Sequence, residues 1–255
     1  VRGTDASQFS VSPSLATIIA KRNQYFTVGF YPQSAGAKIA SLVIAHNGAG
    51  SPTSVALSGT GSLPKLGDIT TVAGTGFFGF SGDGGPAAKA QLEYPRGVAV
   101  DAIGNVYIAD TSNHRIRRVG PHGNITTFAG SGPIGYGNGG YTGDGGLATK
   151  AMLNSPEGVA VDMKGNVYIA DTGNSCIRRV DSDGIITTFA GTGLDENRSI
   201  REGSLATQSR VYKPSVVAVD GQGNVYIASG VAIFRVGTDG LITIFAGAEN
   251  KYGFS

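Results

Sequence analysis

The sequence has little charge and a single cysteine. Of its 255 residues, 15% are charged, and the formal net charge is +2. Such a balance gives no long-range field that would steer the chain onto nucleic acid or an anionic membrane surface. Cys176 stands alone, which excludes an internal disulfide framework and a thiolate metal cluster. No stretch reaches the roughly 18–20 consecutive apolar residues that cross a bilayer, so we expect no membrane insertion.

The N-terminus has neither an initiator methionine nor the basic and apolar regions of a signal peptide. Glycine, in contrast, is abundant, with 41 residues. Many glycines together with few charges are typical of an all-β protein with short strands and tight turns.

One unit of about 60 residues occurs three times, which is typical of a repeat array or propeller. The clearest copy reads Gly158-Val-Ala-Val-Asp162, Gly165-Asn-Val-Tyr-Ile-Ala-Asp171, Ile177-Arg-Arg-Val180 and Gly184-Ile-Ile-Thr-Thr-Phe-Ala-Gly191. The other copies centre on Asn105 and Asn224. Each copy has four short apolar runs closed by turn residues, which predicts four strands. Because the runs are apolar at nearly every position, both faces of each sheet should be covered.

These units resemble NHL repeats, the blades of a class of β-propellers. Gly-Val-Ala-Val-Asp, Asn-Val-Tyr-Ile-Ala-Asp and Asn113-His-Arg-Ile116 carry the match. The resemblance implies an all-β partial propeller over residues 68–255, with three nearly complete four-stranded blades and an extra N-terminal strand at 68–74. Closed rings typically have four to eight blades, and the last copy stops mid-motif at Ser255. We therefore expect a fragment truncated at both ends, whose bare blade faces favour self-association.

Residues 1–61 have a different pattern, with strands expected at 24–30, 37–45 and 53–57. The segments Gly3-Thr-Asp-Ala-Ser-Gln-Phe-Ser-Val, Phe30-Tyr-Pro-Gln-Ser-Ala-Gly36 and Leu57-Ser-Gly-Thr-Gly61 resemble the Hydin-type, choice-of-anchor D family. That resemblance implies a fragment of an immunoglobulin-like β-sandwich; the alternative is an unrelated three-strand cap. Residues 62–67 are expected to be a short linker stiffened by proline.

A glycine-rich insert precedes the first two blades, at residues 79–95 and 140–156. Pro86 is suited to the first position of a short helix, on which Ala88 and Leu92 would share one side. Asp83 and Asp144 lie in loops that look like ion-binding loops, and they are the calcium candidates. Each loop offers one carboxylate, whereas calcium takes about six to eight oxygen ligands. Turn formation is therefore favoured, and no cofactor is expected.

The recurring carboxylates follow the first two strands of the blades. Asp101, Asp162 and Asp220 end the first strand, and Asp110 and Asp171 end the second. Because they recur by blade, their simplest role is to shape turns. The histidines do not recur by blade, and Cys176 occupies the position that Arg115 has in the first copy. No catalytic pairing can be assigned from spacing, so no catalytic residue is expected.

The basic residues are densest in the third strand of each repeat, at Arg115, Arg117, Arg118, Arg178 and Arg179. Some NHL propellers bind single-stranded RNA on a basic face. Here no aromatic residues are interleaved with the arginines, and the third copy keeps only Arg235 of the pair. We expect these arginines to alternate on a solvent-exposed outer strand, and we expect no nucleic-acid partner.

The function that remains is a non-catalytic binding or scaffold module that presents a propeller face to a protein, peptide or glycan. Fold-level analogy places it in a larger bacterial secreted or surface protein, hence outside the cell, at its surface or in the periplasm. One alternative is a propeller enzyme, a metal-dependent lyase or hydrolase whose site lies mainly in missing blades. The other is an RNA-binding propeller. The residues expected to form partner-binding loops are Asp110, Asn113, His114, Arg115, Asp171, Asn174 and Arg178.

Overall fold

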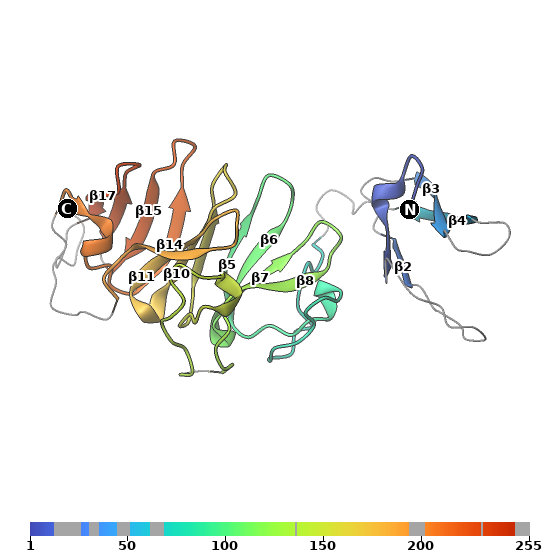
Figure 1. The fold of residues 1–255 in the computed structure, drawn as a ribbon. Coiled ribbons are helices and arrows are strands. Elements are labelled where there is room, and N and C mark those ends of the chain that lie inside the picture. The colour runs from blue at the N-terminus through green and yellow to red at the C-terminus, as the bar shows by residue number, and fades with distance from the viewer. Residues whose placement is uncertain are drawn as a thin grey trace. The chain divides into compact units, whose positions relative to one another are not determined.

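The computed structural model describes residues 1–12, 27–30, 36–44, 52–61, 69–135, 137–193, 202–230 and 232–247. The chain divides into two units, Val1–Thr70 and Thr71–Ser255. Figure 1 shows the elements of both units. The expected linker at 62–67 lies outside the described residues.

The N-terminal unit contains two antiparallel strand pairs, preceded by a 3-10 helix. The helix is η1 (Ala6–Gln8), and the pairs are β1 (Phe9–Ser12) with β2 (Thr27–Phe30) and β3 (Gly36–Ile44) with β4 (Thr53–Gly61). The last two expected strands are confirmed, although β4 continues further than expected, and β1 was missed. The described part of the first expected strand is β2. The immunoglobulin-like assignment stays a prediction.

The second unit contains three blades, each an antiparallel sheet in which consecutive strands are neighbours. The four-strand repeat predicted from the sequence is confirmed. Blade 1 comprises β5 (Pro95–Val100), β6 (Val106–Asp110), β7 (Arg115–Val119) and β8 (Ile125–Ala129). Blade 2 comprises β9 (Gly158–Val161), β10 (Val167–Asp171), β11 (Cys176–Val180) and β12 (Ile186–Ala190). Blade 3 comprises β14 (Pro214–Val219), β15 (Val225–Ser229), β16 (Ala232–Val236) and β17 (Leu241–Gly247), with β13 (Ser204–Leu205) added beside β17.

Apolar side chains fill the spaces between consecutive blades, which explains the apolar runs in the sequence. Tyr107 and Ile116 of blade 1 share a buried cluster with Val159 and Ile169 of blade 2. A second cluster joins blade 2 to blade 3 in the same way, with Ile177 packed among residues such as Val217. A strand in the middle of this stack has a neighbour on both faces, so it does not alternate between apolar and polar residues.

The structure differs from two local expectations. Residues 69–74 form no strand in the described chain; Ile69 and Val72 are exposed, because no partner strand lies beside them among the described residues. In the first insert, the expected short helix is a single 3-10 turn, η2 (Ala87–Lys89), and Pro86 is its N-cap and not its first residue. Ala87 and Ala90 are the buried residues there, whereas Ala88 is exposed.

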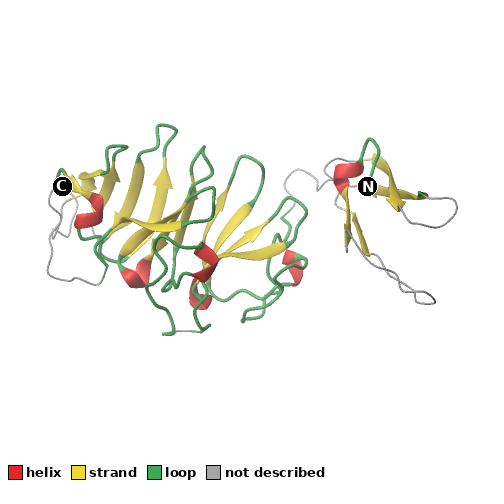
Figure 2. Cartoon of the chain, in the orientation of Figure 1, coloured by secondary structure: helices red, strands yellow, loops and turns green. Residues whose placement is uncertain are grey.

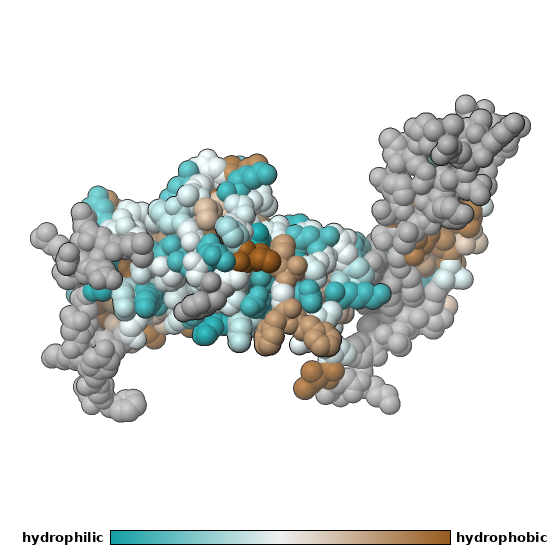
Figure 3. All heavy atoms as spheres, turned by 90° about the horizontal axis from the view of Figure 1, so that it is seen from below, coloured by the Kyte–Doolittle hydropathy of each residue, from teal (hydrophilic) through white to brown (hydrophobic). Residues whose placement is uncertain are grey.

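The blades have two unlike edges, which Figure 2 distinguishes. In an antiparallel meander the first and third turns lie at one edge and the second turn lies at the other. The edge with the second turn holds the 3-10 helices η3 (Thr111–Asn113) and η5 (Thr172–Asn174), while the inserts contribute η4 (Ala148–Lys150) and η6 (Ala206–Gln208). We call the edge with the first and third turns the hairpin edge, and the edge with the second turn the 3-10 edge. Figure 3 views the protein from below, the side where the short helices of Figure 2 lie, and shows mostly polar or neutral residues with small apolar groups.

Candidate functional site

The residues expected to bind a partner lie at the 3-10 edge, but their side chains are buried. They are Asp110, Asn113, His114, Arg115, Asp171, Asn174 and Arg178. In blade 2, Asp171 accepts hydrogen bonds from the backbone N–H of Asn154 at 2.7 Å and from the amide of Asn174 at 2.8 Å. Because these side chains are buried and bonded within the chain, they offer little surface to a ligand, and their role as partner-binding loops stays a prediction.

The arginines of the third strand are also internal. Arg178 is fully buried, and its guanidinium lies 2.5 Å from Asp144 and 3.5 Å from Asp171. Arg117 bridges Asp83 and Asp110 in blade 1 at 2.6 and 3.2 Å. The expected solvent-exposed strand of alternating charge is therefore wrong at these two positions. A buried guanidinium also cannot contact the phosphates of an RNA.

The same contacts account for the calcium candidates. Asp83 accepts hydrogen bonds from Arg117 and from the backbone and hydroxyl of Thr127. Asp144 accepts from Arg178 and from the backbone of Thr188. Each loop is thus fixed by an arginine, and the described residues contain no group of three or more His, Cys, Asp or Glu arranged to hold a metal.

His114 joins blade 1 to blade 2. Its Nδ1 accepts the backbone N–H of Ser155 at 2.9 Å, and its Nε2 lies 2.8 Å from the carbonyl oxygen of Gly135. This pairing assigns the proton to Nε2. Both ring nitrogens are therefore engaged by backbone groups, and the ring has a positioning role.

Burial changes the pKa of the acidic groups at this edge. It raises the pKa of Asp171 to about 6, although hydrogen bonds from Asn154 and Asn174 and the charge of Arg178 act in the opposite direction. Burial also raises the pKa of Asp110 and of the Cys176 thiol. Cys176 therefore stays a protonated thiol at neutral pH, which suits a packed residue and not a nucleophile.

At the hairpin edge, an aspartate organises the first turn of each blade. Asp162 accepts the backbone N–H groups of Lys164 and Asn166 at 2.9 and 2.8 Å, the Asn166 amide at 2.7 Å and the hydroxyl of Tyr168 at 3.4 Å. Asp101 and Asp220 repeat the arrangement. The predicted turn role of these three aspartates is confirmed. A hydrogen bond from the Asn224 side chain lowers the pKa of Asp220, as expected for a carboxylate that receives donors.

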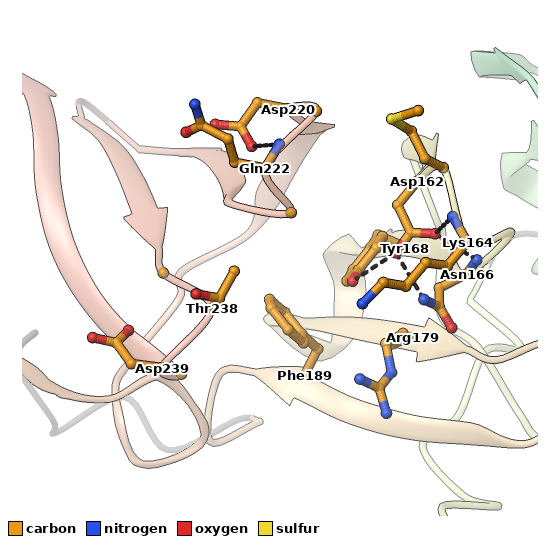
Figure 4. Close-up of a pocket in the computed structure, with 15 residues that line it drawn as sticks. Asp162, Lys164, Asn166, Tyr168, Arg179, Phe189, Asp220, Gln222, Thr238 and Asp239 are labelled. Carbon is orange, nitrogen blue, oxygen red and sulfur yellow. Dashed lines mark hydrogen bonds between the residues drawn. The ribbon is translucent and has the colours of Figure 1, made fainter.

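A cleft of about 470 Å³ lies at the hairpin edge between blades 2 and 3. We call it the turn cleft. One wall comes from blade 2 and the other from the turns 220–223 and 237–240 of blade 3. Figure 4 shows the side chains of the two walls on opposite sides of the space. The labelled residues that line it are Asp162, Lys164, Asn166, Tyr168, Arg179, Phe189, Asp220, Gln222, Thr238 and Asp239.

The floor of the turn cleft is aromatic and fixed. Tyr168 contacts Phe189 edge to face, with ring centroids 5.0 Å apart. Burial and the charge of Asp162 raise the pKa of Tyr168, although Arg179 acts against them, so its hydroxyl stays protonated and donates to Asp162. Because Asp162 holds both the turn and the tyrosine, the cleft is shaped before any ligand arrives.

Two polar groups of the turn cleft are available to a ligand. The ammonium of Lys164 and the hydroxyl of Thr238 have no hydrogen bond or ion pair within the described chain. Asp239 accepts the backbone N–H of Leu241 through one oxygen at 3.1 Å. The blade 2 wall is therefore cationic, and the blade 3 wall carries an exposed carboxylate.

Sequence reasoning missed this site, although the repeats contain a signal for it. The turn aspartate, asparagine and tyrosine recur in all three blades, but the residue two after the aspartate is Ile103, Lys164 or Gln222. In the third turn, the residue before the last glycine is His122, Asp183 or Asp239. The variable residues of exposed turns mark the surface that differs from blade to blade.

Comparison with known proteins agrees with this architecture. The family profile of the Teneurin NHL domain matches residues 79–137 and 136–202. Teneurin-1 of Mus musculus is 35% identical over 111 residues, which cover 42% of this chain and 4% of that protein. The repeats are NHL-type propeller blades.

Other matches come from different proteins. Protein SUPPRESSOR OF QUENCHING 1, chloroplastic, of Arabidopsis thaliana is 34% identical over 105 residues, which cover 41% of this chain and 9% of that protein. A solved gluconolactonase from Xanthomonas campestris aligns with 16% identity and a TM-score of 0.43, covering 64% of this chain and 50% of that one. The chain spans less than a tenth of the length of either relative named here.

Proposed function

We infer that the NHL-type blades form a non-catalytic binding or scaffold module whose partner, a protein, peptide or glycan, contacts the turn cleft. The observation that carries this proposal is the set of unengaged charged groups around the cleft, above all Lys164 and Asp239. Ligand sites commonly combine an apolar floor with a few placed polar groups, in volumes of about 300–1,000 Å³. The turn cleft has both features and falls within that range.

The rigidity of the walls supports the proposal. The carboxylates of Asp162 and Asp220 accept hydrogen bonds from backbone N–H groups of their own turns, so the backbone around the cleft is held in place. A preorganised surface binds at a lower entropic cost than a mobile loop. The neighbouring variable residues can then change the ligand without changing the fold.

The enzyme alternative makes a different demand. A metal-dependent lyase or hydrolase would need ligands from blades beyond this chain, because the described acidic residues of the blades mostly shape turns and hold arginines. Metal analysis and activity assays on the full reading frame would distinguish the two functions. A bound metal that required blade residues would favour the enzyme.

The setting of the module is also part of the proposal. We place it in a larger bacterial secreted or surface protein, with an immunoglobulin-like domain before the propeller. Its similarity to Teneurin-1 supports the location outside the cell, and only that part of the placement. No helix among the described residues is long and apolar enough to cross a membrane. Protease accessibility of the protein in intact cells of its host would test a surface location, because added protease digests only protein exposed outside the cell.

Self-association is a further part of the proposal. Val98 of blade 1 is 64% exposed, whereas its equivalents Val159 and Val217 are 6% and 5% exposed beneath the preceding blade. An apolar blade face of this kind favours contact with another blade. Light scattering across a dilution series would detect such association, and a constant monomer mass would contradict it.

The binding function is testable with a panel of short peptides and oligosaccharides on the immobilised protein. Lys164→Ile is the matched variant, because blade 1 carries Ile103 in the same turn. The proposal expects saturable binding of at least one ligand class that Lys164→Ile weakens. No saturable binding across the panel, or binding that the variant leaves unchanged, would contradict it.

A further inference from the structure

The charges of the turn cleft are separated by wall. Lys164 and Arg179 belong to blade 2, and Asp239 belongs to blade 3. In Figure 4 the ammonium of Lys164 points into the space between the walls, and Asp239 lies across from it. Phe189 lies between them. The cleft therefore has a positive side, a negative side and an apolar floor.

We propose that the turn cleft binds a peptide segment in which an acidic side chain stands close to a basic one. This proposal rests on the binding function inferred above and names its ligand. The acidic side chain pairs with Lys164 and Arg179, and the basic one pairs with the free oxygen of Asp239. The backbone between them lies over Phe189 and hydrogen bonds to Gln222 and Thr238.

The two signs of charge favour this ligand over the other classes. A purely acidic ligand, such as a nucleic acid or a polyanionic glycan, would place negative charge against Asp239. A neutral sugar would give Lys164 only neutral hydroxyl acceptors and would leave the charges of both walls without an opposite charge. A segment with both charges satisfies both walls, whereas a purely acidic ligand meets a like charge at Asp239.

The carboxylates of the turns do not weaken this argument. Asp162 lines the cleft near Lys164, but both its oxygens accept hydrogen bonds within its own turn and from Tyr168. Asp220 is engaged in the same way in blade 3. Asp239 keeps one oxygen without a hydrogen bond given by the described chain, so it is the carboxylate that a basic side chain can reach.

The repeats supply variants that should fold. Lys164→Ile installs the residue of blade 1, and Asp239→His installs the residue that blade 1 has at the matching turn position, His122. Lys89→Gln is the control for loss of an exposed lysine, because blade 3 has Gln208 at that position of its insert. Lys89 lies in η2, away from the residues that line the cleft.

The experiment is calorimetric titration of the whole 255-residue chain with capped five-residue peptides. One peptide carries aspartate and lysine separated by one or two glycines, and its control carries asparagine and glutamine instead. A disaccharide containing glucuronic acid is the third ligand. We expect the charged peptide to bind and the neutral peptide to bind about tenfold more weakly or not at all. Lys164→Ile and Asp239→His should each weaken the charged peptide about threefold to tenfold, while Lys89→Gln changes nothing.

The outcomes separate the two proposals. If the disaccharide binds and Lys164→Ile weakens it, while the charged peptide does not bind, the peptide inference is overturned and the binding function stands. If the charged peptide binds equally well to Asp239→His, the two-charge inference is overturned, because one wall then suffices. If none of the ligands binds the wild-type chain, the peptide inference fails, and the binding function is judged by the wider panel.

Discussion

Replacing Arg178 by phenylalanine should be strongly destabilising, although phenylalanine is what blade 3 uses at this position. Arg178 is fully buried between Asp171, also fully buried, and the half-exposed Asp144. Removing the guanidinium leaves Asp171 as a buried carboxylate without its cation. Breaking a buried ion pair in this way costs about 3–5 kcal/mol. The midpoint of urea unfolding should therefore fall by about 1–3 M, given typical denaturant slopes.

The structure also indicates how the loss can be recovered. Blade 3 has Ser229 at the position of Asp171 and Phe234 at that of Arg178, and Phe234 is buried. The double variant Asp171→Ser/Arg178→Phe removes both charges at once. We expect its cost to be smaller than the sum of the two single costs by about 1–3 kcal/mol, because no buried charge is left alone.

Urea unfolding of the wild type, both single variants and the double variant measures this coupling. Arg96→Ala is the control, because Arg96 is an exposed arginine paired with Glu157 at 3.4 Å; its cost should be about 0.5 kcal/mol. A cost for Arg178→Phe as small as that of the control would refute the buried-pair reasoning. Strict additivity in the double variant would refute the coupling.

Three further predictions concern stability. The pKa of Asp171 is raised from 3.8 to about 6, so the folded chain holds a proton that the unfolded chain releases. The contribution of Asp171 to the free energy of unfolding therefore falls as pH rises from about 4 through 6. Asp171→Asn should reduce this slope in unfolding measured across the range, with the part due to Asp110 remaining. Gly158→Ala would place a Cβ 2.8 Å from a backbone oxygen of β14 and should cost about 1–3 kcal/mol in urea unfolding, whereas Gly221→Ala, with open space at its Cβ, should not. Thr172→Val loses the hydrogen bond that its hydroxyl donates to the carbonyl of Pro214 in the next blade at 2.7 Å, and should lower stability by about 1 kcal/mol without changing the circular dichroism spectrum.

The blades were predictable because their determinants are local. Asp162 meets its donors within six residues, and the same spacing recurs at Asp101 and Asp220. Because similar sheets stack on one another, a sheet between two others is covered on both faces, and its strands are apolar at nearly every position. The missed strand β1 and the absent strand at 69–74 depend instead on which segment lies beside them, and a pattern within one strand does not contain that information.

The buried arginines were not predictable from their own strand. Asp144 lies far before Arg178 in the sequence, so no local pattern joins them. The repeats did contain a signal. Blade 2 has Asp144, Arg178 and Thr188 at three positions that contact one another. At the matching positions blade 3 has Glu202, Phe234 and Ile244, so all three residues differ together. Comparing copies position by position would have identified these residues as partners.

The turn cleft was missed for a related reason. It is built from turns of two blades, and each turn alone has the appearance of solvent-exposed connecting structure. The sequence analysis predicted partner binding at positions of the 3-10 edge that differ between copies. There His114 and Ser175 are buried. At the hairpin edge the same kind of variation, at Lys164 and Gln222, falls on exposed residues. Variation marks a binding surface only where the fold leaves it accessible.

The most direct test of the binding account is the place where a ligand contacts the propeller. Titration of the isotope-labelled chain with the aspartate- and lysine-containing peptide, followed by two-dimensional NMR, gives this location residue by residue. The account predicts saturable shifts at Lys164, Gln222, Thr238 and Asp239, and their loss in Lys164→Ile. Shifts confined to the 3-10 edge around Asn113 and Asn174, with the turn cleft unchanged, would contradict it.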